Sequence, residues 1–154
     1  MEFPYVFLFT KVASTEGFLV ATGIILTAFL FQKDARRAVA LFATAAGMIL
    51  TVNVIKESLQ VARPIEALIE VTGYAFPSGH AAGSAFLAFV VAYLAYPLRT
   101  PLRYLVLSAC VLAALAIGAS RIAFQVHTPV QVFAGYLIGA LFAFIFTRFS
   151  TSTR

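Results

Sequence analysis

Charged residues are scarce in this sequence. They make up 11% of the 154 residues, whereas a soluble domain normally carries about 25%. Tryptophan is absent, and the single cysteine, Cys110, excludes an intrachain disulfide. Hydrophobic residues make up 62% of the chain, and the mean hydropathy is +0.96. This composition excludes a soluble enzyme, a disordered chain, a disulfide-stabilised secreted domain and a free nucleic-acid binder, and it predicts an integral membrane protein.

Five apolar runs are close to the length that crosses about 30 Å of hydrocarbon as a helix. They cover residues 17–31, 38–55, 80–96, 104–119 and 128–146. The predicted fold class is therefore all-α, a polytopic transmembrane helical bundle of about five helices. Residues 1–16 mix aromatic and charged side chains, and we expect them to lie at the membrane interface. No repeat or linker divides the chain, so residues 1–154 are predicted to form one domain.

Basic residues are distributed unequally between the two ends of the predicted helices. One end receives Lys33, Arg36, Arg37, Arg99, Arg103, Arg148 and Arg154. The other end receives Lys11, Lys56, Arg63 and Arg121. The positive-inside rule predicts a multi-pass protein of the cell membrane with its N-terminus outside and its C-terminus in the cytoplasm. The formal charge of +5 is thus interpreted as a topology signal, and no nucleic-acid partner is expected.

Two polar stretches flank the loop between the second and third predicted spans. The first, KESLQVARP, carries Lys56 and Arg63, which alone are typical of interface anchors. The second, FPSGH, places Ser78 as a helix cap, Gly79 where a backbone can approach a ligand, and His80 in the first helical turn. Free N–H groups and the positive end of the helix dipole make this an anion site with a titratable group. Alone, it also fits an ordinary cap with an interfacial histidine.

A third polar stretch, SRIAFQVHTPVQ, joins the fourth and fifth predicted spans. The short loop brings Arg121 and His127 close together. Helix capping alone accounts for three residues of this stretch without any function. Thr128 would be the N-cap, Pro129 the first helical residue and Gln131 the partner in a capping box. This explanation leaves Arg121 and His127 without a role, and both interpretations can hold at once.

The three stretches converge on one predicted face of the membrane and contain both histidines of the chain. Three cations, two imidazoles and a helix N-terminus predict a pocket for a multiply charged phosphate. The cations would neutralise phosphoryl oxygens, one histidine would attack phosphorus, and the other would protonate the departing oxygen. No carboxylate pair or Cys/His cluster indicates a metal site, so we expect no metal and no cofactor.

These stretches resemble the motifs KxxxxxxRP, PSGH and SRxxxxxHxxxD of the type 2 phosphatidic acid phosphatase (PAP2) superfamily, in the same order and spacing. The resemblance implies that His127 is the nucleophile, forming a phosphohistidine, and that His80 is the acid for the leaving group. It further implies a helical bundle with its active site near the outer membrane surface. The phosphate-binding residues that it implies are Lys56, Arg63, Ser78, Gly79 and Arg121.

The sequence departs from the family pattern in two ways. Membrane members commonly have six helices, whereas five are predicted here. Gln131 stands where the family motif has Asp; a glutamine oxygen can orient His127 but cannot balance an imidazolium charge. Members that resemble dolichyl diphosphatases carry an HTxxQ segment like residues 127–131, and this resemblance favours a polyprenyl diphosphate substrate.

The leading hypothesis is a membrane phosphatase acting on a lipid phosphate or diphosphate, with polyprenyl diphosphate favoured and membrane lipids as its surroundings. A phosphatidic acid or phosphatidylglycerol phosphate phosphatase is the alternative within the enzyme class, because the motif residues recognise the phosphate and not the lipid tail. A non-catalytic lipid-phosphate binder or transporter is the alternative outside it, since intramembrane ionisable groups also mark transport paths.

Overall fold

The computed structural model describes residues 15–151 as a bundle of α-helices, with no strand in that range. The helices are α2 (Thr15–Phe31), α3 (Ala35–Leu59), α4 (Gly79–Leu94), α5 (Thr100–Ala123) and α6 (Pro129–Thr151). The all-α prediction is therefore confirmed, with one helix for each predicted span. The predicted interfacial segment 1–16 lies outside the described residues except for its last two, which begin α2.

A polar cap, rather than the edge of the apolar run, sets the start of α3. Asp34 caps α3 by accepting a hydrogen bond from the Arg37 N–H at 3.0 Å, so this helix begins before the predicted apolar run. It also continues to Leu59, beyond the predicted end at Ile55. Lys56 consequently lies in the last turn of α3, on a regular helix, and its direction is fixed by the helix.

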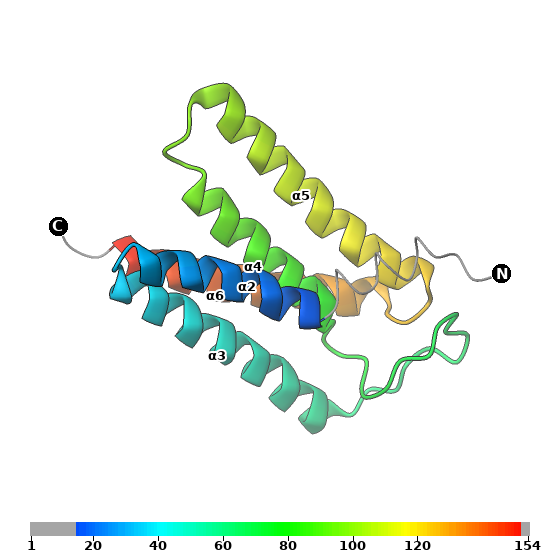
Figure 1. The fold of residues 1–154 in the computed structure, drawn as a ribbon. Coiled ribbons are helices and arrows are strands. Elements are labelled where there is room, and N and C mark those ends of the chain that lie inside the picture. The colour runs from blue at the N-terminus through cyan, green and yellow to red at the C-terminus, as the bar shows by residue number, and fades with distance from the viewer. Residues whose placement is uncertain (1–14, 152–154) are drawn as a thin grey trace.

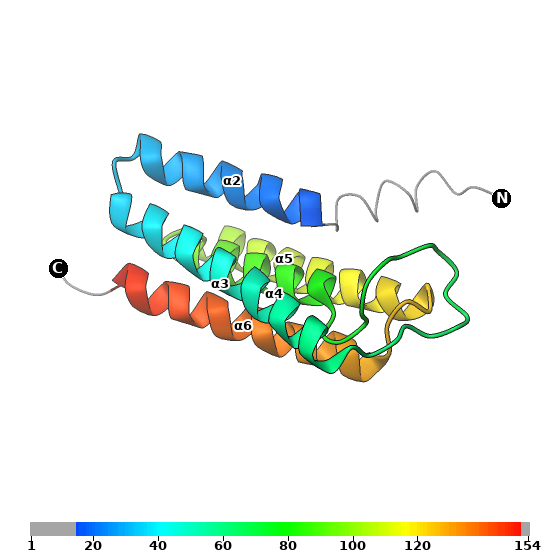
Figure 2. The same ribbon diagram turned by 90° about the horizontal axis from the view of Figure 1, so that it is seen from below.

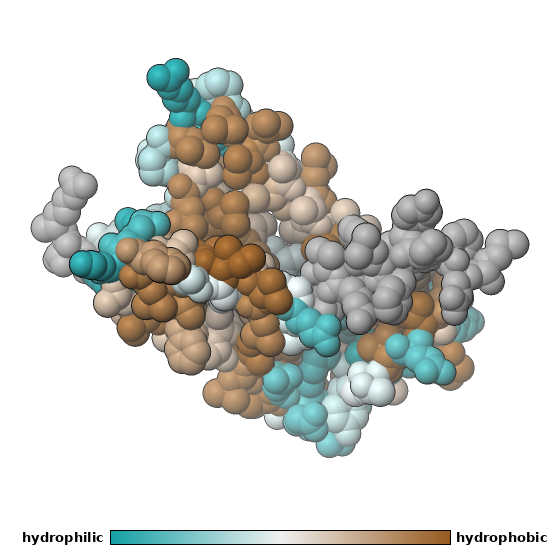
Figure 3. Space-filling model, in the orientation of Figure 1, coloured by the Kyte–Doolittle hydropathy of each residue, from teal (hydrophilic) through white to brown (hydrophobic). Residues whose placement is uncertain are grey.

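Three of the described helices are long and apolar enough to cross a membrane: α3, α5 and α6, with 25, 24 and 23 residues. The other two, α2 and α4, are also apolar but have 17 and 16 residues. Many large apolar side chains are exposed, and Figure 3 shows them as a brown band between hydrophilic ends. Such a surface requires a lipid environment, so the protein is a multi-pass membrane protein.

The helices alternate in direction, which places the connecting segments at two opposite ends of the bundle (Figures 1 and 2). The short α2–α3 and α4–α5 connections lie at the end where α6 finishes. Residues 60–78 and 124–128 lie at the other end, beside the start of α2. All three polar stretches found in the sequence are therefore brought to one end of the molecule.

Helix α4 lies at the centre and contacts all four other described helices. Its closest neighbour is α6, because Gly135 and Gly139 allow the two backbones to meet. A Cβ atom at Gly135 would collide with the Ser78 carbonyl oxygen, and one at Gly139 with that of Ala82. Lipid supplies no hydrophobic drive between helices, so close contact of this kind stabilises the bundle through van der Waals packing.

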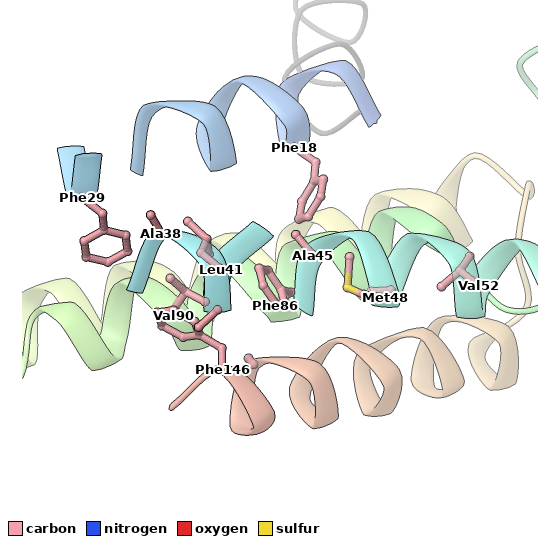
Figure 4. Close-up of a cluster of buried hydrophobic side chains, with 13 residues drawn as sticks. Phe18, Phe29, Ala38, Leu41, Ala45, Met48, Val52, Phe86, Val90 and Phe146 are labelled. Carbon is pink, nitrogen blue, oxygen red and sulfur yellow. The ribbon is translucent and has the colours of Figure 1, made fainter. Parts of the chain in front are cut away.

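Aromatic and aliphatic side chains from α2, α3, α4 and α6 fill the core (Figure 4). The Phe18 and Phe86 rings, for example, make an edge contact with centroids 5.9 Å apart. Helix α5 contributes no residue to this cluster, and Figure 1 shows it leaning away from the bundle. The residues that α5 does bury, Gly118 and Arg121, lie near its C-terminal end, next to the polar loops.

Candidate active site

A pocket of about 390 Å³ opens at the end of the bundle where the polar stretches meet. Its walls come from α2, α3, α4 and the segments 60–78 and 124–128. Five of the eight predicted site residues line it: Lys56, Arg63, Gly79, His80 and His127. The other three, Ser78, Arg121 and Gln131, do not form its wall but contact residues around it. All three are buried, at 0%, 2% and 6% exposure.

His127 is held in a tight turn between α5 and α6. The N–H groups of Val126 and His127 both donate to the Arg121 carbonyl oxygen, at 3.1 and 3.2 Å, and so close the turn. The His127 side chain is buried, at 4% exposure, and its Nδ1 lies 3.1 Å from Gln131 Oε1. The same amide oxygen accepts the Thr128 N–H at 3.0 Å, which fixes the oxygen rather than the nitrogen on this side.

This arrangement determines the tautomer of His127. An amide oxygen only accepts hydrogen bonds, so Nδ1 must carry the hydrogen and donate it to Gln131. The unprotonated Nε2 then carries the lone pair that a nucleophile needs. The Gln131 N–H donates in turn to Thr128 Oγ1 at 3.4 Å, which completes the capping box at the start of α6. The hydrogen bonds that the capping and the orienting interpretations of Gln131 require are therefore compatible with each other.

The pKa of His127 is lowered from its ordinary value of 6.5 to about 4. Burial is the main cause, because it disfavours the charged imidazolium; the hydrogen bond to Gln131 opposes it, and the charges of Arg63 and Lys56 lower the pKa further. The imidazole is consequently neutral at physiological pH, the protonation state in which it can attack an electrophile.

Arg63 connects the 60–78 segment to the turn that carries His127. Its Nε donates to the Gly73 carbonyl at 3.0 Å, its Nη2 to that of Thr72 at 3.1 Å, and its Nη1 to that of Val126 at 3.2 Å. The same Nη1 lies 3.4 Å from His127 Nε2. A cation therefore stands directly against the nitrogen that bears the lone pair.

Lys56 extends from the last turn of α3 and donates a hydrogen bond to the Tyr74 carbonyl oxygen. Its partner, like those of Arg63, is a neutral carbonyl rather than a carboxylate. An anionic phosphate oxygen forms shorter and stronger hydrogen bonds with a cation than a neutral carbonyl does. Both cations can therefore exchange these backbone partners for a phosphate.

The N-terminal ends of α4 and α6 are joined directly behind the pocket. Ser78 caps α4 by accepting from the Ala81 N–H at 3.4 Å, and its own N–H donates to the Gln131 carbonyl at 3.0 Å. His80 follows in the first turn of α4, where the helix dipole is positive. The two histidines thus come from the starts of two adjacent helices and line the same pocket.

Arg121 is a buried cation whose hydrogen-bonding capacity is not filled. Its Nε donates to Ser120 Oγ at 3.1 Å, and its guanidinium lies 5.4 Å from the centre of the Phe124 ring. Its Nη2 is buried and has no hydrogen-bond partner among residues 15–151. Nor does any carboxylate in that range form an ion pair with Arg121, since the one pair found there joins Arg37 to Asp34 at the opposite end. A buried unpaired charge is costly, so this position favours an anionic ligand.

Two further polar residues of α3 line the pocket, Asn53 and Glu57, and neither is among the residues predicted from the sequence. Asn53 is the only asparagine of the chain and interrupts an apolar run one turn before Lys56. That position was a usable signal, because a polar residue inside a membrane helix commonly faces a cavity. In the described range, no three His, Cys, Asp or Glu residues are grouped as metal ligands.

Taken together, the fold and the pocket define a helical membrane protein with a pocket lined by two histidines and by cationic side chains. Residues 36–154 match the PAP2 superfamily, and the chain therefore belongs to this family. Family and fold together support a membrane lipid phosphatase.

A solved structure of similar fold is that of a transmembrane PAP2-type phosphatidylglycerolphosphate phosphatase from Bacillus subtilis. The TM-score is 0.85 at 22% sequence identity, over 98% of this chain and 77% of that one. No curated protein matches the sequence significantly.

Proposed function

We propose that the protein is a metal-independent membrane phosphatase that removes phosphate from a lipid phosphate or diphosphate through a phosphohistidine intermediate. The observation that carries this proposal is the state of His127: a neutral imidazole, oriented by Gln131, whose Nε2 faces Arg63 at 3.4 Å. A phosphate that takes over the hydrogen bonds of Arg63 would bring its phosphorus next to this nitrogen.

In the first chemical step, His127 Nε2 attacks phosphorus and the bond between phosphorus and the leaving oxygen breaks. The charges of Lys56, Arg63 and Arg121 stabilise the phosphoryl oxygens in the transition state. His80 gives its proton to the leaving oxygen, which departs as a lipid alcohol or lipid phosphate.

In the second step, a water molecule attacks the phosphohistidine and releases inorganic phosphate. His80, now unprotonated, accepts a proton from that water, and Nε2 of His127 is regenerated with its lone pair. Gln131 keeps the imidazole in one tautomer throughout both steps.

We favour a polyprenyl diphosphate as the substrate. The HTxxQ segment at residues 127–131 resembles that of dolichyl diphosphatases, and the inner pocket wall is apolar, with Phe18, Met48, Ile49 and Val52. A hydrocarbon chain fits against these side chains while its phosphates meet the cations. Phosphatidylglycerol phosphate is the second candidate, because the Bacillus subtilis protein of similar fold is a phosphatidylglycerolphosphate phosphatase.

The location of the site is part of the proposal. Lys33, Arg36, Arg37 and Arg148 lie at the end opposite the pocket. If that end is cytoplasmic, as the positive-inside rule expects, the active site opens on the extracytoplasmic face of the cell membrane.

The proposal is tested by measuring release of inorganic phosphate from a panel of prenyl diphosphate, prenyl phosphate, phosphatidic acid and phosphatidylglycerol phosphate, in detergent with a chelator present. We expect release from prenyl diphosphate, and none from the His127→Ala variant, which lacks the nucleophile. Arg103→Ala, at the opposite end of the bundle, serves as the matched control and should keep the parental rate. Silence of the parent protein across the whole panel would support the binder or transporter hypothesis instead.

A further inference from the structure

One face of α3 forms a continuous wall of the pocket. Its members follow the helical repeat at spacings of three and four residues: Met48, Ile49, Val52, Asn53, Lys56 and Glu57. The three inner residues are apolar, and the three outer residues are polar or charged. Val52 and Asn53 mark the level at which the wall changes from apolar to polar.

On this face of α3, Asn53 is the one polar side chain between Lys56 and the apolar residues. It lies three residues before Lys56, which corresponds to about 4.5 Å along the helix axis. Its side chain is exposed to the pocket and has no hydrogen-bond partner among residues 15–151. Beyond it the pocket is lined by Ile49, Met48 and, from α2, Phe18.

This layering restricts the chemistry of the ligand next to the scissile phosphate. A glycerophospholipid carries a glycerol and two ester groups between its phosphate and its chains, and these need polar partners over several levels of the wall. A prenyl diphosphate carries one further phosphate and then only hydrocarbon. Below Lys56, the wall formed by α3 has one polar side chain, Asn53, and then only apolar side chains. This order of polar and apolar groups fits a prenyl diphosphate.

We propose that Asn53 is a specificity-determining residue whose side-chain NH₂ donates a hydrogen bond to the second phosphate of a prenyl diphosphate. The inference rests on the proposed function and names its substrate class. A neutral amide suits this position, because it donates to phosphate oxygens without adding a further buried cation below Lys56. Glu57 lies one turn farther out along the same face of α3.

The test compares the binding of two non-hydrolysable ligands, a prenyl methylenediphosphonate and a prenyl monophosphonate of the same chain length, to the detergent-solubilised protein. Asn53→Leu removes the amide and keeps the number and branching of the side-chain heavy atoms. It should weaken diphosphonate binding about tenfold, the value of one hydrogen bond to a charged group, and leave monophosphonate binding nearly unchanged. Asn53→Asp should weaken the diphosphonate further, because a carboxylate repels it.

Val54→Leu is the matched control, since Val54 neighbours Asn53 on α3, is 53% exposed and does not line the pocket. It should bind both ligands like the parent protein. Equal weakening of both ligands by Asn53→Leu, or no weakening of either, would overturn the inference. Asn53→Asp provides the same comparison if the leucine variant does not fold.

Binding and turnover separate this inference from the proposed function. A protein that releases no phosphate but binds the diphosphonate in an Asn53-dependent way would refute the catalytic proposal and support the specificity role. If the protein hydrolyses prenyl diphosphate but Asn53→Leu binds the diphosphonate as tightly as the parent does, the specificity role is refuted. The catalytic proposal is then unaffected.

Discussion

Gln131 Oε1 lies 3.1 Å from His127 Nδ1 and accepts the Thr128 N–H at 3.0 Å, so a single oxygen both orients the imidazole and caps α6. The amide performs both tasks without a negative charge. A neutral partner leaves the pKa of the buried His127 low, whereas a carboxylate there would stabilise the imidazolium. The identity of residue 131 therefore controls the charge state of the proposed nucleophile as well as its direction.

The first prediction concerns Gln131→Asp. The carboxylate favours the charged form of His127 and raises its pKa, so the acid limb of the pH profile of kcat/KM should move to higher pH, with a modest change in rate at neutral pH. The measurement is phosphate release as a function of pH for the parent and the variant.

The same variant distinguishes an enzyme from a binder. If the parent protein is silent on every lipid and Gln131→Asp creates phosphate release, the parent is a binder that lost catalysis at this position. Thr128→Ala, which removes one cap hydrogen bond without touching His127, is the control for loss of helix capping alone.

The second prediction is a dependence of stability on pH. The pKa of His127 is about 4 in the folded protein and about 6.5 when it is exposed on unfolding, so the unfolded state binds more protons between these values. Stability should be unaffected by this group above pH 6.5 and should fall as the pH drops from about 6.5 to about 4. Thermal unfolding in detergent, with the uncharged variant His127→Gln as comparison, measures it; an equal acid loss in both proteins would assign the effect to other groups.

The fold and the convergence of the polar stretches could be predicted from the sequence, because both follow from the number and order of the apolar runs. Apolar runs give the number of helices, and because two helices separate residues 60–78 from residues 124–128, both segments lie at the same end. The contacts of Arg63 could not be predicted, since they depend on how residues 72–74 and Val126 lie in three dimensions. Asn53 stands out in the sequence as a polar residue within an apolar run, but which cavity it lines depends on the face that α3 turns toward the pocket.

The third prediction concerns His80 as the acid for the leaving group. His80→Ala should slow hydrolysis of a lipid phosphate far more than that of an activated aryl phosphate, because a weakly basic leaving group departs without a proton. General acid catalysis of this kind typically increases the rate by a factor of about 10² to 10⁴. The ratio of kcat values on the two substrates is the measurement, and an equal loss on both would remove His80 from this role.

The fourth prediction is the orientation in the membrane. In a Cys110→Ala background, a cysteine placed at the exposed Ala62, beside Arg63, should react with an impermeant thiol reagent added to intact cells. A cysteine at the exposed Gln32, at the opposite end of the bundle, should react only after lysis. The reverse pattern would place the pocket on the cytoplasmic face.

The last prediction follows from the unfilled Nη2 of Arg121, which is buried without a partner in the described part of the chain. Replacing a buried, incompletely paired charge by an apolar side chain of similar length relieves its desolvation cost, so Arg121→Met should unfold at the same temperature as the parent or a higher one.

The same change should abolish the stabilisation that vanadate, a mimic of the pentacoordinate phosphoryl transition state, gives the parent protein. Arg121→Lys, which restores a charge without the planar fork, should recover part of that stabilisation. Thermal unfolding with and without vanadate measures both effects, and a variant destabilised in the absence of ligand but still stabilised by vanadate would show that Arg121 supports the turn rather than the anion.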